Sequence, residues 1–389
     1  MPLAGRDDID LTLLVPAVWH EYGTTRLAEP ASDGLNVVIS KTYFNAVGPA
    51  KWYLQYYKDL ARVLLEYRPN VIHLWQEPWS FVASHAQWLR DRLLPDAAVL
   101  LETDQNILRR LPPPFEWARR RALASTDLLI ARQAEAEAVS RACGYRGPAR
   151  FVGYGIDPEI FHSGAAPREQ RPDRLALGYV GRVIRDKGIF DILEALALQA
   201  DPSVQFTVMG DGADRAAFEE RARALGLSDR VFVRASGSLD EVAGFMRSLD
   251  ACLLMSRSGR TWKEQFGRVI IESQACGVPV IGSDSGAIPE VVGAGGWIVP
   301  EGNPAALAAL FARLRANPGA IADAGASGLA NVASRFTYAR VSEQLRDAYE
   351  TAAAVRAAGR AETRLGRDTI VGPVGRGDLQ RSDVVPGES

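Results

Sequence analysis

Two glutamates eight residues apart, Glu264 and Glu272, have the types and spacing that most clearly suggest chemistry. Glu264 precedes an apolar run with helical patterning, Gly267 permits a close approach of the backbone, and Glu272 falls about a turn and a half into the predicted helix. The free N–H groups at the start of this helix would face a phosphate, with a carboxylate on either side to accept hydrogen bonds from paired hydroxyl groups. A sugar nucleotide presents this combination of groups.

The alternative is that both glutamates are ordinary solvated carboxylates. The neighbouring residues 269–271, 275 and 276 are apolar and leave little polar face on the helix, so an unpaired carboxylate at Glu272 would be costly. The segment 277–282 then has the pattern of a helix end followed by a short strand that is buried on both faces. This context favours the binding interpretation.

Glycine-rich turns follow several predicted strands of the second half. The segment 181–188, Gly-Arg-Val-Ile-Arg-Asp-Lys-Gly, lies between a strand and a helix and carries cations to the mouth of the sheet. One such turn alone is ordinary, but turns at successive strand ends beside the two glutamates favour a shared nucleotide pocket, because ligands of open α/β sheets bind at this edge. The glycines in these turns that we expect to bind a nucleotide are Gly181, Gly210 and Gly237, and the cations are Arg182 and Lys187.

Short apolar runs alternate with helical patterns in both halves, which predicts parallel sheets covered by helices on both faces. In the first half, strands are predicted at residues 11–15, 36–39, 71–75, 98–102 and 127–131, and helices at 51–67 and 80–94. In the second half, strands are predicted at 175–180, 204–209, 231–233, 251–255, 279–282 and 296–299. The helices of that half are predicted at 189–199, 215–225, 239–248, 268–276, 288–292 and 304–316.

Domain boundaries follow from changes in composition along the chain. We expect an N-terminal domain over residues 1–163 and a C-terminal domain over 164–345, joined by a polar, proline-rich linker at 164–174. Residues 346–389 are expected to form a terminal helix and a tail that is disordered from residue 359, where the chain becomes rich in glycine, proline and charge.

The composition is that of a large soluble enzyme, with 389 residues, 47% hydrophobic and 24% charged. The net charge of −2 gives no footprint for nucleic acid. Three cysteines without a C-x-x-C and four histidines without metal-ligand spacing support neither a disulfide framework nor a metal site, so we expect no cofactor. Apolar runs well short of about 18 residues and a polar N-terminus predict a cytoplasmic protein. The basic clusters 109–110 and 119–121 are either a solvated face or a peripheral contact with an anionic acceptor or the inner membrane face.

The second half resembles the donor-binding domain of glycosyltransferase family 4, the retaining GT-B enzymes. The matching motifs are G-R-x-x-x-x-K-G at 181–188, G-D-G at 210–212, the two glutamates of an E-x7-E element, and the run A-C-G-V-P-V-I-G-S-D-S-G-A-I-P-E-V at 275–291. The resemblance covers about residues 175–336. The first half matches only in strand–helix order and in a G-I-D-P-E-I-F hinge at 155–161. The resemblance implies an α/β fold of two Rossmann-like domains facing a central cleft.

The resemblance also implies roles for individual residues. Arg182 and Lys187 would hold the diphosphate of the leaving nucleotide, and Glu264 would contact sugar hydroxyls, which makes these three the catalytic candidates. Glu272 would bind the ribose diol, and the segment around Gly237 would frame the base. Backbone N–H groups would contact sugar or phosphate at Phe266, Gly267 and Arg268. These roles agree with the chemistry, because fixed cations and a helix terminus stabilise the charge that grows on a departing diphosphate.

The first half departs from the family pattern. Its first predicted strand leads into residues 16–23 without a paired glycine, so we expect the chain to lack the first strand–helix unit of the domain and to be weakly active. The strand end at 102–106 contains no histidine, so no catalytic base is assigned.

Aromatic residues gather around the strand ends of the first half. They suggest an acceptor cleft in which sugars stack on rings, although core and surface packing is an alternative. The aromatic residues are Tyr43, Phe44, Trp52, Trp75 and Trp79. The acceptor-side candidates are Glu77, Trp79 and Glu102.

The sequence therefore predicts a transferase that moves a hexosyl unit from a nucleotide diphosphate sugar to a glycan or lipid-linked acceptor, in cell-surface polysaccharide or glycolipid synthesis. The family resemblance implies that the enzyme is retaining. Two alternatives stay open. One is a sucrose- or trehalose-type synthase with a small acceptor, and the other is a non-catalytic nucleotide-sugar-binding protein. A Rossmann dehydrogenase is disfavoured, because no G-x-G-x-x-G follows the first strand.

Overall fold

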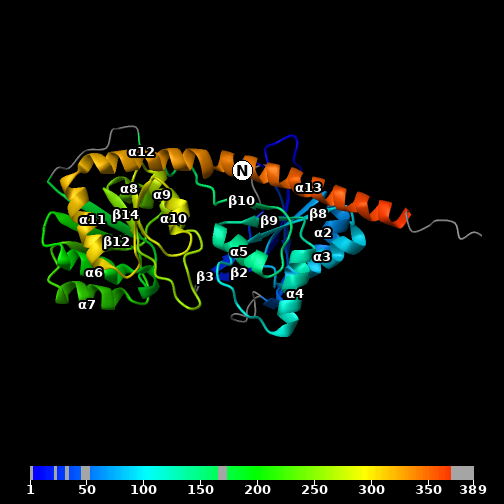
Figure 1. Ribbon diagram of the computed structural model, residues 1–389, viewed down its shortest axis with the longest axis horizontal. Helices are drawn as coiled ribbons and strands as arrows, with labels where there is room; N and C mark the ends of the chain where they lie inside the picture. Colours follow the sequence, from blue (N-terminus) through cyan, green and yellow to red (C-terminus); the bar gives the residue numbers. More distant parts are fainter. Residues whose placement is uncertain (1–2, 22–23, 31–34, 45–52, 165–172, 369–389) are drawn as a thin grey trace, which may run out of the picture.

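The protein is built from two α/β halves that lie side by side along its long axis (Figure 1). The computed structural model describes residues 3–21, 24–30, 35–44, 53–164 and 173–368. Each half contains a parallel sheet with helices on its faces, which confirms the predicted α/β fold class. Helices α12 (Pro318–Arg335) and α13 (Tyr338–Asp368) run along one side of both halves (Figure 1).

The second half is organised around a six-stranded parallel sheet of order β13-β12-β11-β14-β15-β16. The strands are β11 (Leu175–Val180), β12 (Val204–Met209), β13 (Val231–Arg234), β14 (Ala251–Leu254), β15 (Val280–Ser283) and β16 (Gly296–Val299). β14 and β15 are buried along their whole length, as expected for strands covered on both faces. Three strands, β11, β12 and β16, begin and end at the predicted residues, so the pattern of this half was a reliable guide to its fold.

The helices of the second half also follow the predicted order. They are α6 (Ile189–Leu198), α7 (Arg215–Ala224), α8 (Leu239–Arg247), α9 (Arg268–Ala275), α10 (Ile288–Val292) and α11 (Pro304–Ala316), with a short 3-10 turn η1 (Arg185–Lys187) before α6. A capping box between Ser238 and Glu241 starts α8. Gly277 follows α9 with φ +72°, a left-handed conformation that glycine adopts without strain.

The first half contains a four-stranded parallel sheet of order β10-β9-β8-β7. Its strands are β7 (Val71–Trp75), β8 (Ala98–Thr103), β9 (Leu128–Ala131) and β10 (Ala149–Phe151). Its helices are α2 (Leu60–Tyr67), α3 (Phe81–Leu93), α4 (Pro113–Ala124) and α5 (Ala134–Ala142). Among the two-stranded units that precede them, β1 (Thr12–Pro16) pairs in parallel with β4 (Asn36–Ser40), and β2 (Val18–Glu21) forms a hairpin with β3 (Thr24–Leu27).

The helix predicted at 51–67 is wrong in its first part. Residues Tyr56–Tyr57 form the strand β6, which pairs with β5 (Thr42–Tyr43), and α2 begins only at Leu60. Aromatic residues favour strands, and the rings of Tyr43 and Tyr56 form a cross-strand pair with centroids 6.2 Å apart. Residues 51–52, including Trp52, lie outside the described part of the chain.

The predicted disorder from residue 359 is also wrong as far as residue 368. α13 continues to Asp368, whereas residues 369–389 lie outside the described part of the chain. The helix is held by the first half. Ala348 and Ala352 are buried against β8 and β9, and the guanidinium of Arg356 donates to the carbonyl oxygen of Pro95. Arg360 adds an ion pair with Asp96 at 3.0 Å.

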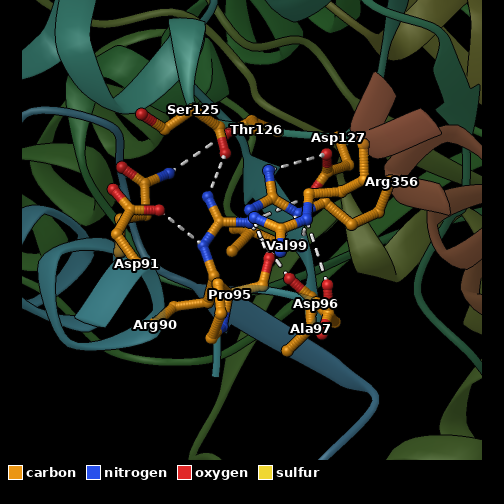
Figure 2. Close-up of polar contacts among 12 residues, drawn as sticks. Arg90, Asp91, Pro95, Asp96, Ala97, Val99, Ser125, Thr126, Asp127 and Arg356 are labelled. Atoms are coloured by element: carbon orange, nitrogen blue, oxygen red, sulfur yellow. Dashed lines mark hydrogen bonds and ion pairs between the residues drawn. The ribbon is translucent and has the colours of Figure 1, made fainter. Parts of the chain in front are cut away.

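A buried arginine organises the region where α13 meets the first sheet (Figure 2). Arg90 of α3 is 1% exposed and donates hydrogen bonds to the carbonyl oxygens of Ala97 (3.0 Å) and Ser125 (3.1 Å). It also lies 3.4 Å from a carboxylate oxygen of Asp127, which accepts a 2.7 Å hydrogen bond from the backbone N–H of Val99. One guanidinium thus ties the end of α4 to the start of β8.

We predict that Arg90→Met destabilises the first half by about 3–5 kcal/mol, because two carbonyl groups lose their donor and the Asp127 carboxylate loses its nearer cation and keeps only Arg356 at 3.9 Å. The matched control is Arg92→Met on the same helix, where the arginine is exposed and stacks over the Trp88 ring at 4.3 Å. Thermal unfolding of the two variants checks this. Equal melting temperatures would show that Arg90 does not organise this region.

Candidate functional site

A buried ion pair lies at the carboxyl ends of the second-half strands. The Lys187 ammonium is 2.6 Å from Oε2 of Glu264, and the side chains are 15% and 10% exposed. The same oxygen accepts a 2.6 Å hydrogen bond from the hydroxyl of Ser256. Lys187 lies in the turn after β11, and Ser256 follows β14. Because β11 and β14 are neighbours in the sheet, they deliver both partners to Glu264.

Two close backbone approaches shape this region. A side chain at Gly286 would place its Cβ 2.1 Å from the carbonyl oxygen of Glu264, and Gly286 has a φ of +53°. A Cβ at Gly210 would lie 1.9 Å from the carbonyl oxygen of Gly181. The predicted glycine turns therefore let neighbouring strand ends meet, which brings Gly181 and Gly210 together and places residue 286 against the Glu264 loop.

The start of α9 carries the second predicted glutamate. Gly267 is the residue before the helix, with φ +79°, and Phe266 beside it is 3% exposed. Glu272 has a side chain that is 16% exposed and lies 3.7 Å from the exposed guanidinium of Arg268. Burial raises the pKa of the Glu272 carboxyl, and the nearby arginine opposes this shift.

The other predicted donor residues lie around this pair. Arg182 is exposed in the turn after β11, where its carbonyl oxygen accepts a 2.8 Å hydrogen bond from the hydroxyl of Tyr179. Gly237 lies in an exposed turn between β13 and α8. Sequence reasoning missed Ser256 and Trp262, whose ring lies 4.9 Å from the Lys187 ammonium. The position of Ser256 at a strand end was a usable signal, because ligands of such sheets bind at that edge.

In the first half, Glu77 lies in the turn after β7 and is held by the end of β8. Its Oε2 accepts a 2.6 Å hydrogen bond from the hydroxyl of Thr103, and its Oε1 accepts a 3.1 Å bond from the backbone N–H of Asp104. Burial raises the pKa of Glu77 to about 7, and the pKa of Asp104 to about 6. The Glu77 carboxyl can therefore carry a proton close to neutral pH, whereas the Asp104 carboxylate also pairs with the Arg132 guanidinium at 3.1 Å.

Glu102, the second acceptor-side candidate, is bonded inside the first half. Its carboxylate forms an ion pair with Arg132 and lies 3.1 Å from Nε2 of His73. Burial and the positive charge of Arg132 lower the pKa of His73 to about 4, so the imidazole is neutral at pH 7. Trp79, the third candidate, packs near Tyr53, with ring centroids 6.5 Å apart.

The two halves meet at the loop that carries Glu264. The side-chain N–H of Asn106 donates a 3.0 Å hydrogen bond to the carbonyl oxygen of Glu264, and Gln265 donates a 3.1 Å bond to the carbonyl oxygen of Asp104. Tyr154 meets Phe266 edge to face at 5.1 Å. Sequence reasoning did not find these contacts, which join residues more than a hundred positions apart.

Residues 166–328 match the family model of glycosyl transferases group 1. The chain is 33% identical over 230 residues to a D-inositol 3-phosphate glycosyltransferase of Streptomyces bingchenggensis, covering 51% of this chain and 49% of the relative. It is 25% identical over 273 residues to an MMP alpha-(1->4)-mannosyltransferase of Mycolicibacterium hassiacum, covering 69% and 61%. A 2-deoxystreptamine N-acetyl-D-glucosaminyltransferase of Streptomyces fradiae is 34% identical over 141 residues, covering 34% and 32%. The chain thus spans about half or less of the length of the first relatives that it matches.

Solved glycosyltransferase structures share the fold of this chain. Anabaena Alr3699/HepE in complex with UDP superimposes with a TM-score of 0.65 at 17% identity, covering 82% of this chain and 87% of the other. Sucrose-phosphate synthase from Thermosynechococcus elongatus superimposes with a TM-score of 0.62 at 21% identity, covering 87% and 88%. These neighbours confirm the predicted arrangement of two Rossmann-like domains, and the group 1 match covers the segment that contains the Lys187–Glu264 pair.

We predict that the wild type loses stability relative to Glu77→Gln as the pH rises from about 4.5 to 7. The folded state raises the pKa of Glu77 from 4.5 to about 7, so in this range the folded state keeps a proton that the unfolded state has released. The free energy of unfolding of the wild type should fall relative to that of Glu77→Gln across this pH range, and the difference should level off above about pH 7. Melting temperatures at successive pH values check this, with Glu66→Gln on the exposed face of α2 as the control. A constant difference from pH 5 to 8 would contradict the prediction.

Proposed function

We propose that this chain is a retaining glycosyltransferase of family 4 that takes a hexosyl unit from a nucleotide diphosphate sugar and transfers it to a glycan or lipid-linked acceptor, in cell-surface polysaccharide or glycolipid synthesis. The observation that carries the proposal is the buried Lys187–Glu264 pair beside the start of α9, inside the segment that matches group 1. The names of the relatives, which include an inositol phosphate glycosyltransferase and a mannosyltransferase, support the reaction class.

In the proposed donor site, charged side chains and backbone N–H groups would both bind the donor. Lys187 is paired with Glu264 at 2.6 Å, so a bound diphosphate would share this ammonium with the carboxylate. The exposed Arg182 would add positive charge from the same turn, as a fork that complements the lysine's point charge. As the nucleoside diphosphate leaves, negative charge grows on its oxygens, and these cations with the N–H groups at Gly267 and Arg268 would stabilise it. Glu264 would bind sugar hydroxyls and Glu272 the ribose diol.

The remaining residues frame the two substrates in this proposal. Gly181 and Gly210 would let the phosphates approach the backbone, and the turn at Gly237 would lie along the base. On the acceptor side, Glu77 and Trp79 would meet the acceptor. Glu102 is less suited to that role, because Arg132 and His73 already occupy its carboxylate.

The test is a panel of UDP-, GDP- and ADP-sugars, each measured for thermal stabilisation and for slow hydrolysis of the donor. Stabilisation with hydrolysis or transfer supports the proposal. Stabilisation by a donor that is neither hydrolysed nor used for transfer would favour the non-catalytic binding protein. If no donor stabilises the protein, the proposed pocket does not bind nucleotide sugars.

We predict that Glu272→Ala weakens the binding of the nucleoside diphosphate selected by this panel by about 1.5–3 kcal/mol, or roughly 10- to 150-fold, because the ribose diol loses a charged hydrogen-bond partner. Isothermal titration of the variant measures this change. The control is Glu220→Ala on α7, an exposed glutamate of the same half. An affinity equal to that of the control would show that the ribose binds elsewhere.

A contact with the inner membrane face belongs to the same proposal. No helix within the described residues is both long and apolar enough to cross a bilayer. Along α3, however, Phe81, His85 and Trp88 form a stacked series of rings, with centroids 5.6 and 6.2 Å apart, and both large rings are more than 40% exposed. Arg92 covers Trp88 at 4.3 Å, and on the neighbouring α4 the 65% exposed Trp117 is accompanied by Arg121 at 5.8 Å. Exposed aromatic rings beside arginines suit the surface of an anionic bilayer.

We expect the double variant Phe81→Ser, Trp88→Ser to bind less to vesicles of phosphatidylcholine and phosphatidylglycerol than the wild type, because the rings that enter the interface are gone. Co-sedimentation measures the bound fraction. Phe232→Ser, which removes a 43% exposed ring from β13 of the second half, is the control. Equal binding of wild type and double variant would contradict this contact. Binding of the wild type to vesicles of phosphatidylcholine alone, but not to vesicles with phosphatidylglycerol, would contradict it as well.

A further inference from the structure

We propose that Asn106 is a positioning residue for Glu264: its side-chain amide holds the backbone of Glu264 across the junction of the two halves, so that the carboxylate beside Lys187 depends on the first half as well as the second. The inference rests on the proposed function, because it concerns the same carboxylate. Asn106 lies just after β8, at the strand end where no catalytic base is assigned from the sequence, and the inference gives this segment a role.

The contact itself is short and buried. The side chain of Asn106 is 6% exposed, and Nδ2 lies 3.0 Å from the carbonyl oxygen of Glu264. The same oxygen accepts a 3.1 Å hydrogen bond from the backbone N–H of Ala287. One donor therefore comes from each half of the chain, and without Asn106 a buried carbonyl would keep only the partner from its own half.

The segment that carries Asn106 is braced from several sides. The carboxylate of Glu77 accepts hydrogen bonds from Thr103 and from the N–H of Asp104. The amide of Gln105 donates a 2.7 Å bond to the carbonyl oxygen of Ile107, and the hydroxyl of Tyr154 donates a 3.0 Å bond to the Asp104 carboxylate. These bonds fix the backbone on either side of residue 106, so its amide is presented in a defined orientation.

Glu264 is also restrained on its own side. Its carboxylate is bonded to Lys187 and Ser256, and the tight approach of Gly286 leaves its carbonyl oxygen little room to move. A shift of the backbone at residue 264 would therefore either strain the side chain that links it to this held carboxylate or move the carboxylate relative to Lys187 and Ser256. Positioning within a fraction of an ångström matters for a group that would contact the reacting sugar.

Other contacts between the halves provide a comparison. Lys263 forms a 2.9 Å ion pair with Glu135, and Glu290 accepts a 3.0 Å hydrogen bond from the backbone N–H of Ala134. Both contacts are at least partly exposed and involve residues other than Glu264. Their loss would weaken docking of the halves but would leave both hydrogen-bond donors to the carbonyl oxygen of Glu264 in place, so they serve as a comparison for docking alone.

The experiment compares Asn106→Ala and the isosteric Asn106→Asp with the control Glu135→Gln, using the donor that the nucleotide-sugar panel selects. We expect turnover to fall about 10- to 100-fold in both Asn106 variants, while the affinity for the nucleoside diphosphate stays within about threefold of wild type. Asn106→Asp should be the slower of the two, because its carboxylate would face a carbonyl oxygen. Glu135→Gln should keep turnover close to that of the wild type.

Hydrogen exchange of the peptide that spans 256–267 gives a readout that does not need activity. Faster exchange in Asn106→Ala than in Glu135→Gln supports positioning even if the wild type transfers no sugar, which would count against the proposed function alone. Unchanged exchange together with unchanged turnover would overturn the inference. A parallel loss of nucleotide affinity and turnover would also overturn it, because Asn106 would then be part of donor binding.

Discussion

The second half depends on keeping two opposite charges together in a site that is only 10–15% exposed. Burying either charge alone would cost several kcal/mol, so Lys187 and Glu264 require each other, and the hydroxyl of Ser256 satisfies the same carboxylate oxygen. The order of the sheet makes this pair possible. β11 and β14 are neighbours, so the turns after them meet, although 77 residues separate the two charged groups. The glycine turns are then needed because these strand ends approach so closely that a Cβ would collide with backbone.

The two halves are connected through a continuous set of contacts. Where the chain enters α13, the N–H of Ile156 donates a 2.8 Å hydrogen bond to the carbonyl oxygen of Phe336, and the helix then packs on β8 and β9. The Glu264 loop is held by Asn106 and by the Tyr154–Phe266 ring contact, and the Phe266 ring also meets the Phe336 ring edge to face at 5.7 Å. A helix that begins in the second half and is fixed to the first half limits how the halves can rotate. The loop with the buried ion pair therefore lies at a junction whose geometry is set by both halves.

The sequence predicted the second half better than the first for a physical reason. Its central strands β14 and β15 are buried on both faces, and glycines follow several of its strand ends, so apolar runs and glycines mark many boundaries. The E-x7-E spacing directed attention to both glutamates of the site. In the first half, β6 forms because Tyr56 pairs with Tyr43, a contact that a local helical pattern does not reveal. α13 continues past residue 359 because the first half anchors it, through Arg356 and Arg360. The Asn106–Glu264 bond joins residues 158 positions apart and follows only from the docking of the halves.

The two sides of the junction differ in how their carboxylates are compensated. Glu264 has a full cation at 2.6 Å, whereas Glu77 is held by neutral donors, and burial raises its pKa to about 7. A carboxylate of this kind changes its charge near neutral pH, and protonation replaces an acceptor with a donor toward Thr103 or Asp104. These residues directly precede the segment that presents Asn106 to the Glu264 loop. A short path of hydrogen bonds and backbone thus runs from the Glu77 carboxyl of the first half, through residues 103–106, to the carbonyl oxygen of Glu264 in the second half.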